Sequence, residues 1–155
     1  MTYEKFIQEY LARGLLKKQK PDFSAVENFI LRAQKELKTA KANLSIDEGT
    51  AFTVAYLGML HSGRALMLLK GFRAADGQQH KTVVEFMRYA LGEEFKTIVE
   101  YFDKMRRKRN IFTYEVTIAI SRTEADNAIN NAEKFVSLIK HIIKKENPQQ
   151  EFKFK

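Results

Sequence analysis

Apolar residues along this chain recur mainly at steps of three and four, the spacing of helices that bury one face. Between residues 24 and 44 they form a narrow seam, and the capping-box pair Ser24 and Glu27 predicts that this helix begins near Ser24. From about Glu48 to Lys70 they cover nearly the whole circumference, which predicts a central, buried helix. Small residues in this second helix favour close approach of a neighbouring helix, within the fold or across a dimer: Gly58, Ser62, Gly63 and Ala65.

Shorter amphipathic stretches predict three more helices. One runs from Tyr3 to about Leu16, and the basic run between it and Pro21 fits a solvated connector, with a nucleic-acid-binding arm as the alternative. Another opens at His80 after a polar loop, and a third begins at Glu93. The apolar face of the third leads directly into a cationic run, so the packing of this helix fixes where the run points.

The pattern changes after Asn110, because residues 111–120 are mostly β-branched or aromatic and favour a short strand or an ordered loop. Ser121 and Glu124 form another capping box, which predicts a last helix up to about Lys145. Together these elements predict an all-α, up-and-down bundle of four to five helices. We expect three segments: an N-terminal helix and basic connector at 1–22, a helical domain at 23–147 and a flexible tail at 148–155.

Composition narrows the class of function without choosing one. The 155-residue chain carries 27 Lys and Arg against 19 Asp and Glu, a net charge of +8, which favours polyanionic partners such as RNA or nucleotides. The absence of cysteine excludes a disulfide framework and a thiolate zinc site. No basic leader precedes an apolar run, and no apolar stretch approaches the roughly 20 residues that span a bilayer. We therefore expect a soluble, cytoplasmic protein with no membrane partner.

The densest chemistry lies between Asp103 and Glu115. Five of the six residues from Lys104 to Arg109 are cationic, and an amide, apolar side chains and a phenol follow them. This stretch fits a phosphate-handling site; the alternative is a solvated surface patch beside a core tyrosine. The sequence has no Gly-rich phosphate loop, dinucleotide fingerprint, Glu-x-x-His pair or nucleophile elbow. We therefore expect no metal site and no cofactor.

Three polar residues elsewhere have two interpretations each. His61 and Arg64 lie within the apolar central helix, where a satisfied structural hydrogen bond is the simpler interpretation for both. His80 stands at a predicted helix start, where exposed amides favour an anion, although such a histidine more often caps the loop.

Four segments in this order resemble a HEPN domain, the higher-eukaryote and prokaryote nucleotide-binding family: Leu31–Ala40, Ala55–Leu66, His80-Lys81, and Arg109-Asn110 through Tyr114. The resemblance spans about Ser24 to Lys145. It implies a compact helical bundle that usually dimerises, with an arginine, a four- to six-residue spacer and a histidine forming a metal-independent ribonuclease site at the dimer cleft. It also implies that the chain is similar to toxins paired with a nucleotidyltransferase antitoxin.

By position, the resemblance assigns the family arginine to Arg109 and the polar residue after it to Asn110, while Tyr114 stands where the histidine is expected. In such cleavage the ribose 2′-hydroxyl attacks its own phosphate, so a cation must stabilise charge and another group must accept a proton. Tyr114 is a poor acceptor because a phenol titrates near 10. It fits a hydrogen-bond donor, a stacking surface or an acceptor of a nucleotidyl group.

The catalytic candidates are therefore Arg109, Asn110 and Tyr114, and the binding candidates are Lys104, Arg106, Arg107 and Lys108. Residues five apart on a regular helix do not share a face, so Arg109 and Tyr114 converge only if the helix ends between them or Arg109 folds back. Three functions remain open: a toxin-like, RNA-directed metal-independent endoribonuclease, a catalytically degenerate HEPN module that binds nucleotide, RNA or a nucleotidyltransferase, and a structural helical homodimer.

Overall fold

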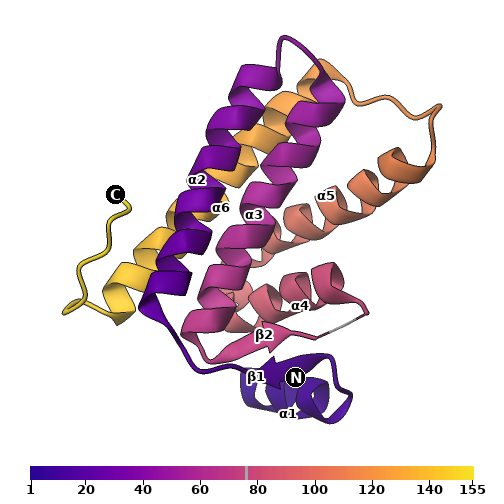
Figure 1. Ribbon diagram of the computed structural model, residues 1–155. Coiled ribbons are helices and arrows are strands. Elements are labelled where there is room, and N and C mark those ends of the chain that lie inside the picture. The colour runs from indigo at the N-terminus through magenta and orange to yellow at the C-terminus, as the bar shows by residue number, and fades with distance from the viewer. Residues whose placement is uncertain (76) are drawn as a thin grey trace.

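Helices make up most of the computed structural model, which describes residues 1–75 and 77–155. The elements in chain order are α1 (Tyr3–Ala12), β1 (Leu16–Lys18), α2 (Phe23–Asn43), α3 (Glu48–Leu69), β2 (Phe72–Ala74), α4 (Gln79–Leu91), a 3-10 turn (Glu93–Phe95), α5 (Lys96–Tyr114) and α6 (Arg122–Glu146). Helices α2, α3 and α6 pack side by side, and α4 and α5 contact α3 as well (Figure 1). The predicted all-α bundle is confirmed.

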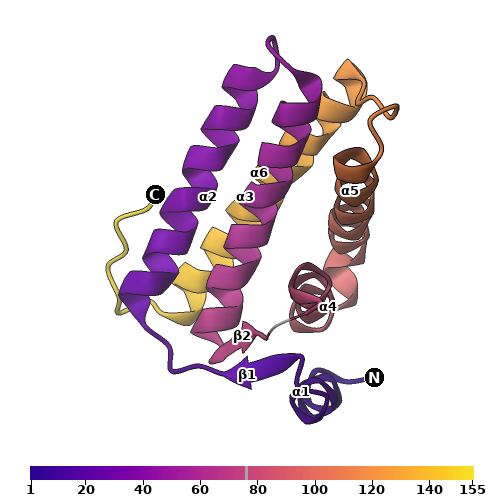
Figure 2. The same ribbon diagram turned by 45° about the vertical axis from the view of Figure 1, so that its right-hand side comes forward.

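Helix α3 is the centre of the bundle and is buried nearly all round, as its sequence predicts (Figure 2). Its small residues serve contacts within the fold. A Cβ atom on Gly58 would lie 3.3 Å from Leu37 Cδ2 of α2, and one on Gly63 would lie 2.8 Å from Val83 Cγ1 of α4. The two glycines therefore let α2 and α4 approach α3 closely.

One expectation about α3 was wrong. Among the described residues, α3 is the one helix long and apolar enough to cross a membrane by length and composition, whereas the sequence pattern suggested that no stretch approached this limit. Within the fold, 72% of its most apolar window is buried, because neighbouring helices surround it.

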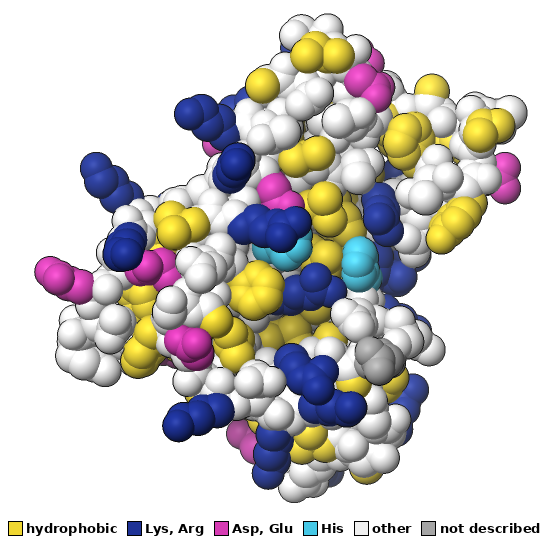
Figure 3. Space-filling model, viewed as in Figure 1, with side chains coloured by type: hydrophobic (Ala, Val, Ile, Leu, Met, Phe, Trp, Pro, Cys, Tyr) yellow, Lys and Arg dark blue, Asp and Glu magenta, His cyan; other side chains and the backbone are white. Residues whose placement is uncertain are grey.

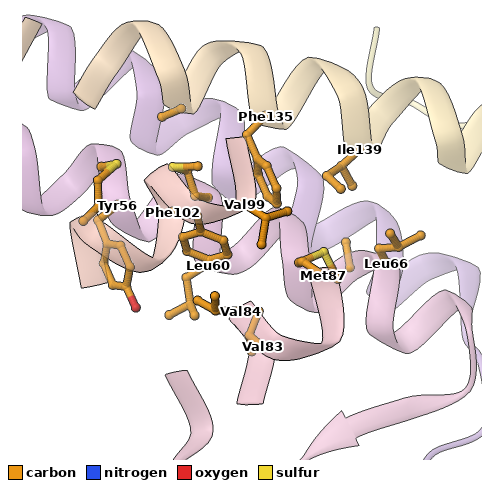
Figure 4. Packing of buried hydrophobic residues seen from close by; sticks show 14 of the residues in the cluster. Tyr56, Leu60, Leu66, Val83, Val84, Met87, Val99, Phe102, Phe135 and Ile139 are labelled. Carbon is orange, nitrogen blue, oxygen red and sulfur yellow. The ribbon is translucent and has the colours of Figure 1, made fainter. Parts of the chain in front are cut away.

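The core between α3, α4, α5 and α6 determines where α5 lies (Figure 4). The ring of Phe102 on α5 lies 5.7 Å from the ring of Tyr56 on α3 and 5.2 Å from that of Phe135 on α6, measured between centroids. All three rings are fully buried. Since Phe102 and Arg106 are one helical turn apart, this packing also sets the direction of Arg106.

The N-terminal segment differs from its prediction. Helix α1 ends at Ala12 rather than near Leu16, after which the chain turns at Gly14, whose φ of +71° suits glycine. Leu16, expected at the end of the helix, and Lys17 and Lys18, expected in the solvated connector, form β1. This strand pairs antiparallel with β2 and places Leu16 opposite Ala74. The pairing is non-local, so local charge gave no sign of it.

The N-cap of helix α2 lies two residues before the expected one. It is Asp22 rather than Ser24, and the Asp22 carboxylate accepts a hydrogen bond from the Ser24 backbone N–H at 2.9 Å. A carboxylate at this position favours the positive end of the helix at least as well as a serine hydroxyl. The Ser121–Glu124 capping box predicted for α6 is confirmed, and the N-cap of α3 is Asp47, whose side chain accepts the Gly49 backbone N–H.

Residues 111–114 continue α5 as helix, so the strand or loop predicted there was wrong for these four positions. Phe112 packs against Gly49 at the start of α3, and this tertiary contact holds the last turn helical despite the β-branched and aromatic composition. Residues 115–120 then form the connection to α6 without regular structure.

The last eight residues, expected to be a flexible tail, lie against α2 and α6. Phe154 is buried, and the carbonyl oxygen of Lys155 accepts hydrogen bonds from Lys140 Nζ at 2.6 Å and Gln34 Nε2 at 3.3 Å. The aromatic rings of Phe152 and Phe23 lie 5.9 Å apart. Two phenylalanines among polar residues thus give the tail enough apolar surface to pack.

Candidate functional site

The cationic run on α5 faces two sides of the helix. One side borders a hollow of about 630 Å³ between α5 and the start of α4, lined by Gly77, Gln78, Gln79, His80, Lys81, Arg106, Arg109 and Asn110. Lysine, arginine and histidine side chains gather around the centre of one face of the molecule (Figure 3). We call the hollow between α4 and α5 the α4–α5 hollow. It holds three of the seven site residues predicted from the sequence.

The other predicted cations point elsewhere. Lys104 and Arg107 line a separate hollow toward α6, and Lys108 Nζ forms a salt bridge with Glu124 Oε2 at 3.3 Å. The helical repeat explains this division, because positions three and four apart share a face whereas adjacent positions do not. A run that looks continuous in sequence therefore supplies only Arg106 and Arg109 to the α4–α5 hollow.

Tyr114 lies outside this hollow. Helix α5 continues through residue 114, so no helix end brings Arg109 and Tyr114 together, and Tyr114 does not line the hollow that Arg109 lines. The Tyr114 residue is 83% exposed. Within one chain the structure brings Arg109 and Asn110 together and leaves Tyr114 apart.

Arg109 carries a buried donor that nothing in the described chain satisfies. Its Nε atom is buried and has no hydrogen-bond partner among residues 1–75 and 77–155. Arg106, by contrast, is held by Asp103, whose Oδ1 lies 2.9 Å from Arg106 Nε. A buried charged donor without a partner is costly, so Arg109 fits a site that an anionic ligand completes.

His80 also lines this hollow, although the sequence predicted it only as a loop cap or an anion-binding residue and not as a catalytic candidate. Its Nδ1 lies 3.0 Å from the hydroxyl oxygen of Tyr56, a contact that spans α3 and α4. Burial raises the pKa of Tyr56 well above its usual range, so the phenol remains protonated at neutral pH. The contact leaves His80 Nε2 as the ring nitrogen that can meet a ligand in the α4–α5 hollow.

The surroundings of His80 keep its ring uncharged. Burial, and after it the nearby charges of Arg64, Arg109 and Arg106, lower the pKa of His80 from 6.5 to about 4. At neutral pH the ring is therefore a neutral imidazole beside two arginines. This arrangement provides a proton acceptor and a phosphate-binding group in one hollow.

Two polar residues of α3 make structural contacts. Arg64 donates from Nη2 to Gln79 Oε1 at 3.2 Å, which ties α3 to the start of α4. His61 Nδ1 lies 2.7 Å from Glu36 Oε1 of α2. Both contacts agree with the structural interpretation of these residues, and Gln79 brings the Arg64 contact to the edge of the α4–α5 hollow.

Acidification is expected to destabilise the fold through His80. At a pH above the ordinary pKa of 6.5 the ring is neutral in both the folded and the unfolded protein. As the pH falls from 6.5 toward the folded-state pKa of about 4, His80 is protonated in the unfolded chain but stays neutral in the folded one, so the folded state loses stability. Because the ring is only half-buried, the loss near pH 5 should be on the order of 1 kcal/mol. Urea unfolding of the wild type and His80→Gln at neutral and acidic pH measures it, and equal pH dependence in both would contradict it.

Comparison with known proteins identifies a match over most of the chain. A family model described as the HEPN domain matches residues 26–142. This range begins in α2 and ends in α6, so it includes every residue of the α4–α5 hollow. No curated protein matches the sequence.

Proposed function

The chain belongs to the HEPN family, whose domains are generally ribonuclease or nucleotide-binding modules, and we propose that it is an RNA-directed, metal-independent endoribonuclease. The observation that carries this proposal is the meeting of Arg106, Arg109 and a neutral His80 in one hollow. Two guanidinium groups suit a phosphodiester, and an imidazole suits proton transfer. The net charge of +8 favours the approach of RNA.

In the proposed reaction the ribose 2′-oxygen attacks the adjacent phosphorus atom, and the bond from phosphorus to the 5′-oxygen breaks. His80 Nε2 takes the 2′-hydroxyl proton, and the departing 5′-oxygen takes a proton from solvent. The products are a 2′,3′-cyclic phosphate and a 5′-hydroxyl. Arg109 and Arg106 stabilise the charge that grows on the phosphoryl oxygens, and Asn110 orients the phosphate. This role requires the tautomer in which Nδ1 carries a proton and donates to Tyr56.

A bound phosphate would also make His80 a better base. The cations that lower its pKa are the groups that a phosphodiester contacts, namely Arg106 and Arg109. An anion between them offsets their charge, so the pKa of His80 rises from about 4 toward its ordinary value. A base whose pKa is nearer the working pH transfers protons more effectively.

A second candidate function is a catalytically degenerate module that binds RNA, nucleotide or a nucleotidyltransferase through the same hollow. The specific observation in its favour is that Tyr114 replaces the expected histidine and lies outside the hollow that Arg109 lines. Such a module would keep the phosphate contacts of Arg109 but would not cleave RNA.

For partners we propose a toxin-like role in the cytoplasm, beside a nucleotidyltransferase antitoxin. Tyr114 is accessible enough to act as its target: the phenolic oxygen would attack the α-phosphate of a nucleoside triphosphate and release pyrophosphate. We also propose a homodimer formed through the end of α5, where Ile111 is 49%, Tyr114 83% and Val116 98% exposed. Such a dimer would bring Tyr114 of one copy toward the α4–α5 hollow of the other.

The proposed activity is tested with purified protein and end-labelled single-stranded RNA in excess EDTA. Cleavage products that end in a 2′,3′-cyclic phosphate and begin with a 5′-hydroxyl are expected, because the attack is intramolecular and uses no metal. RNA that is bound in a salt-dependent way but left intact would favour the degenerate module. RNA neither bound nor cleaved would contradict the endoribonuclease and any RNA-binding role of the degenerate module.

A further inference from the structure

A second hollow is lined by Arg64, whose guanidinium also contacts Gln79 of the α4–α5 hollow. It has a volume of about 410 Å³, in the usual range for small-molecule sites, and it is bordered by the start of α2, the second half of α3 and β2. We call it the α2–β2 pocket. Nothing in the proposed RNA chemistry uses it.

The walls of this pocket combine apolar side chains with cations. Phe29, Met67 and Phe72 supply apolar surface, and Met67 is almost fully buried. Phe29 is held by His61, at a ring-centroid distance of 6.2 Å, and Phe72 by Phe86, at 6.0 Å. Each of the two rings thus packs against another aromatic ring and also lines the pocket.

Three cations face the same pocket: Lys20, Arg64 and Arg73. Among residues 1–75 and 77–155, none of the three forms a salt bridge. Asp22 also lines the pocket, but its carboxylate accepts the Ser24 N–H as the α2 cap. The described lining therefore carries three cations against one carboxylate, a net positive charge, in a place where apolar walls strengthen electrostatic attraction.

We propose that the α2–β2 pocket binds a small organic anion, with an aromatic or aliphatic body against Phe29, Met67 and Phe72. A carboxylate, phosphate or sulfonate group lies among Lys20, Arg64 and Arg73. The apolar walls supply affinity through burial, and the cations select the anionic head group. Arg64 is the deepest of the three, since burial is the main cause that lowers its pKa.

Arg64 connects this pocket to the α4–α5 hollow. It lines the α2–β2 pocket, and its guanidinium donates to Gln79, which lines the other hollow. Its charge also lowers the pKa of His80. An anion on Arg64 offsets that charge and competes with Gln79 for its donors, so the ligand alters the RNA site. This coupling to RNA rests on the proposed function, whereas anion binding does not.

The binding test uses 8-anilinonaphthalene-1-sulfonate and its uncharged analogue N-phenyl-1-naphthylamine, which share the aromatic body. Fluorescence titration of the full chain is expected to give saturable binding of the sulfonate. The analogue should bind at least tenfold more weakly, a difference of about 1.4 kcal/mol, because it lacks the negative charge that the cations attract. The double variant Lys20→Gln/Arg73→Gln should weaken sulfonate binding by a similar factor. Both residues lie at the rim, so the fold is retained.

The matched control is Lys38→Gln/Arg122→Gln, which removes the same net charge from exposed positions of α2 and α6. It should bind the sulfonate as the wild type does. Equal affinity for the two probes, or equal affinity of the two double variants, would overturn the proposed pocket.

The coupling is measured without RNA, through the pH titration of the His80 ring signals in a histidine NMR spectrum. Saturating sulfonate should raise the pKa of His80, because it offsets the nearby Arg64 charge, and His141 on the exposed face of α6 serves as internal control. An unchanged His80 titration with bound sulfonate would overturn the coupling. Failure of RNA cleavage would leave both results intact, so the two proposals fail independently.

Discussion

Arg109→Ala is expected to reduce RNA cleavage by about a hundred- to a thousandfold, the usual loss when one preorganised charge-stabilising donor is removed. Arg109 lines the α4–α5 hollow, and its buried Nε has no hydrogen-bond partner in the part of the chain that the structure describes. Arg109→Lys should recover only part of the loss, because an ammonium keeps the charge but not the planar fork of donors. The measurement is kcat/KM on labelled RNA, with Kd from salt-dependent binding in parallel.

Arg107→Ala is the matched control for Arg109. It removes the same charge from the same helix, but the Arg107 side chain is 64% exposed and belongs to the other side of α5. Its activity should stay within a few-fold of wild type, because rim charges mainly affect association. In cells, growth arrest on expression should be relieved by Arg109→Ala and not by Arg107→Ala. Equal losses in the two variants would contradict a specific role for Arg109.

His80→Ala is expected to reduce kcat by about a hundred- to ten-thousandfold, the usual contribution of a general base. Because His80 is neutral, its removal takes away little attraction for phosphate, so Kd for RNA should change far less than kcat. The acidic limb of the pH–rate profile should disappear together with the activity. Tyr56→Phe should cause a smaller loss, since Tyr56 holds Nδ1 and does not take the proton itself.

His141→Ala is the control for His80, because His141 is exposed on α6 and lines neither proposed site. It should cleave RNA at the wild-type rate. If His80→Ala retained the wild-type rate while Arg109→Ala lost activity, the proton acceptor would have to be another group. A copy of Tyr114 from a dimer partner would then be the next group to test.

The local signals in the sequence predicted the helices that their own residues stabilise. The Ser121–Glu124 capping box lies within one turn of the helix that it starts, so short-range chemistry sufficed. The all-round apolar pattern of α3 likewise placed it at the centre. The family resemblance also held over most of the chain, since the HEPN match covers residues 26–142.

Contacts between distant residues account for the differences. Residues 111–114 have strand-like composition but remain helical, because Phe112 packs on Gly49. Residues 16–18 form a strand because they pair with residues 72–74, which lie more than fifty positions further along the chain. In each case a tertiary contact outweighed a local preference that differs between conformations by about 1 kcal/mol or less.

The sequence by itself determined an all-α fold with positive charge concentrated before Asn110, because periodicity, caps and charge are properties of neighbouring residues, and the resemblance of four of its segments indicated the HEPN family. Only the tertiary structure decided which cations act together. The turn of α5 separated Arg106 and Arg109 from Lys104, Arg107 and Lys108, and it left Tyr114 outside the hollow. The packing of α3, α4 and α5 then placed His80 beside Arg109, although the two lie far apart in sequence, since side chains meet through the core that positions their helices.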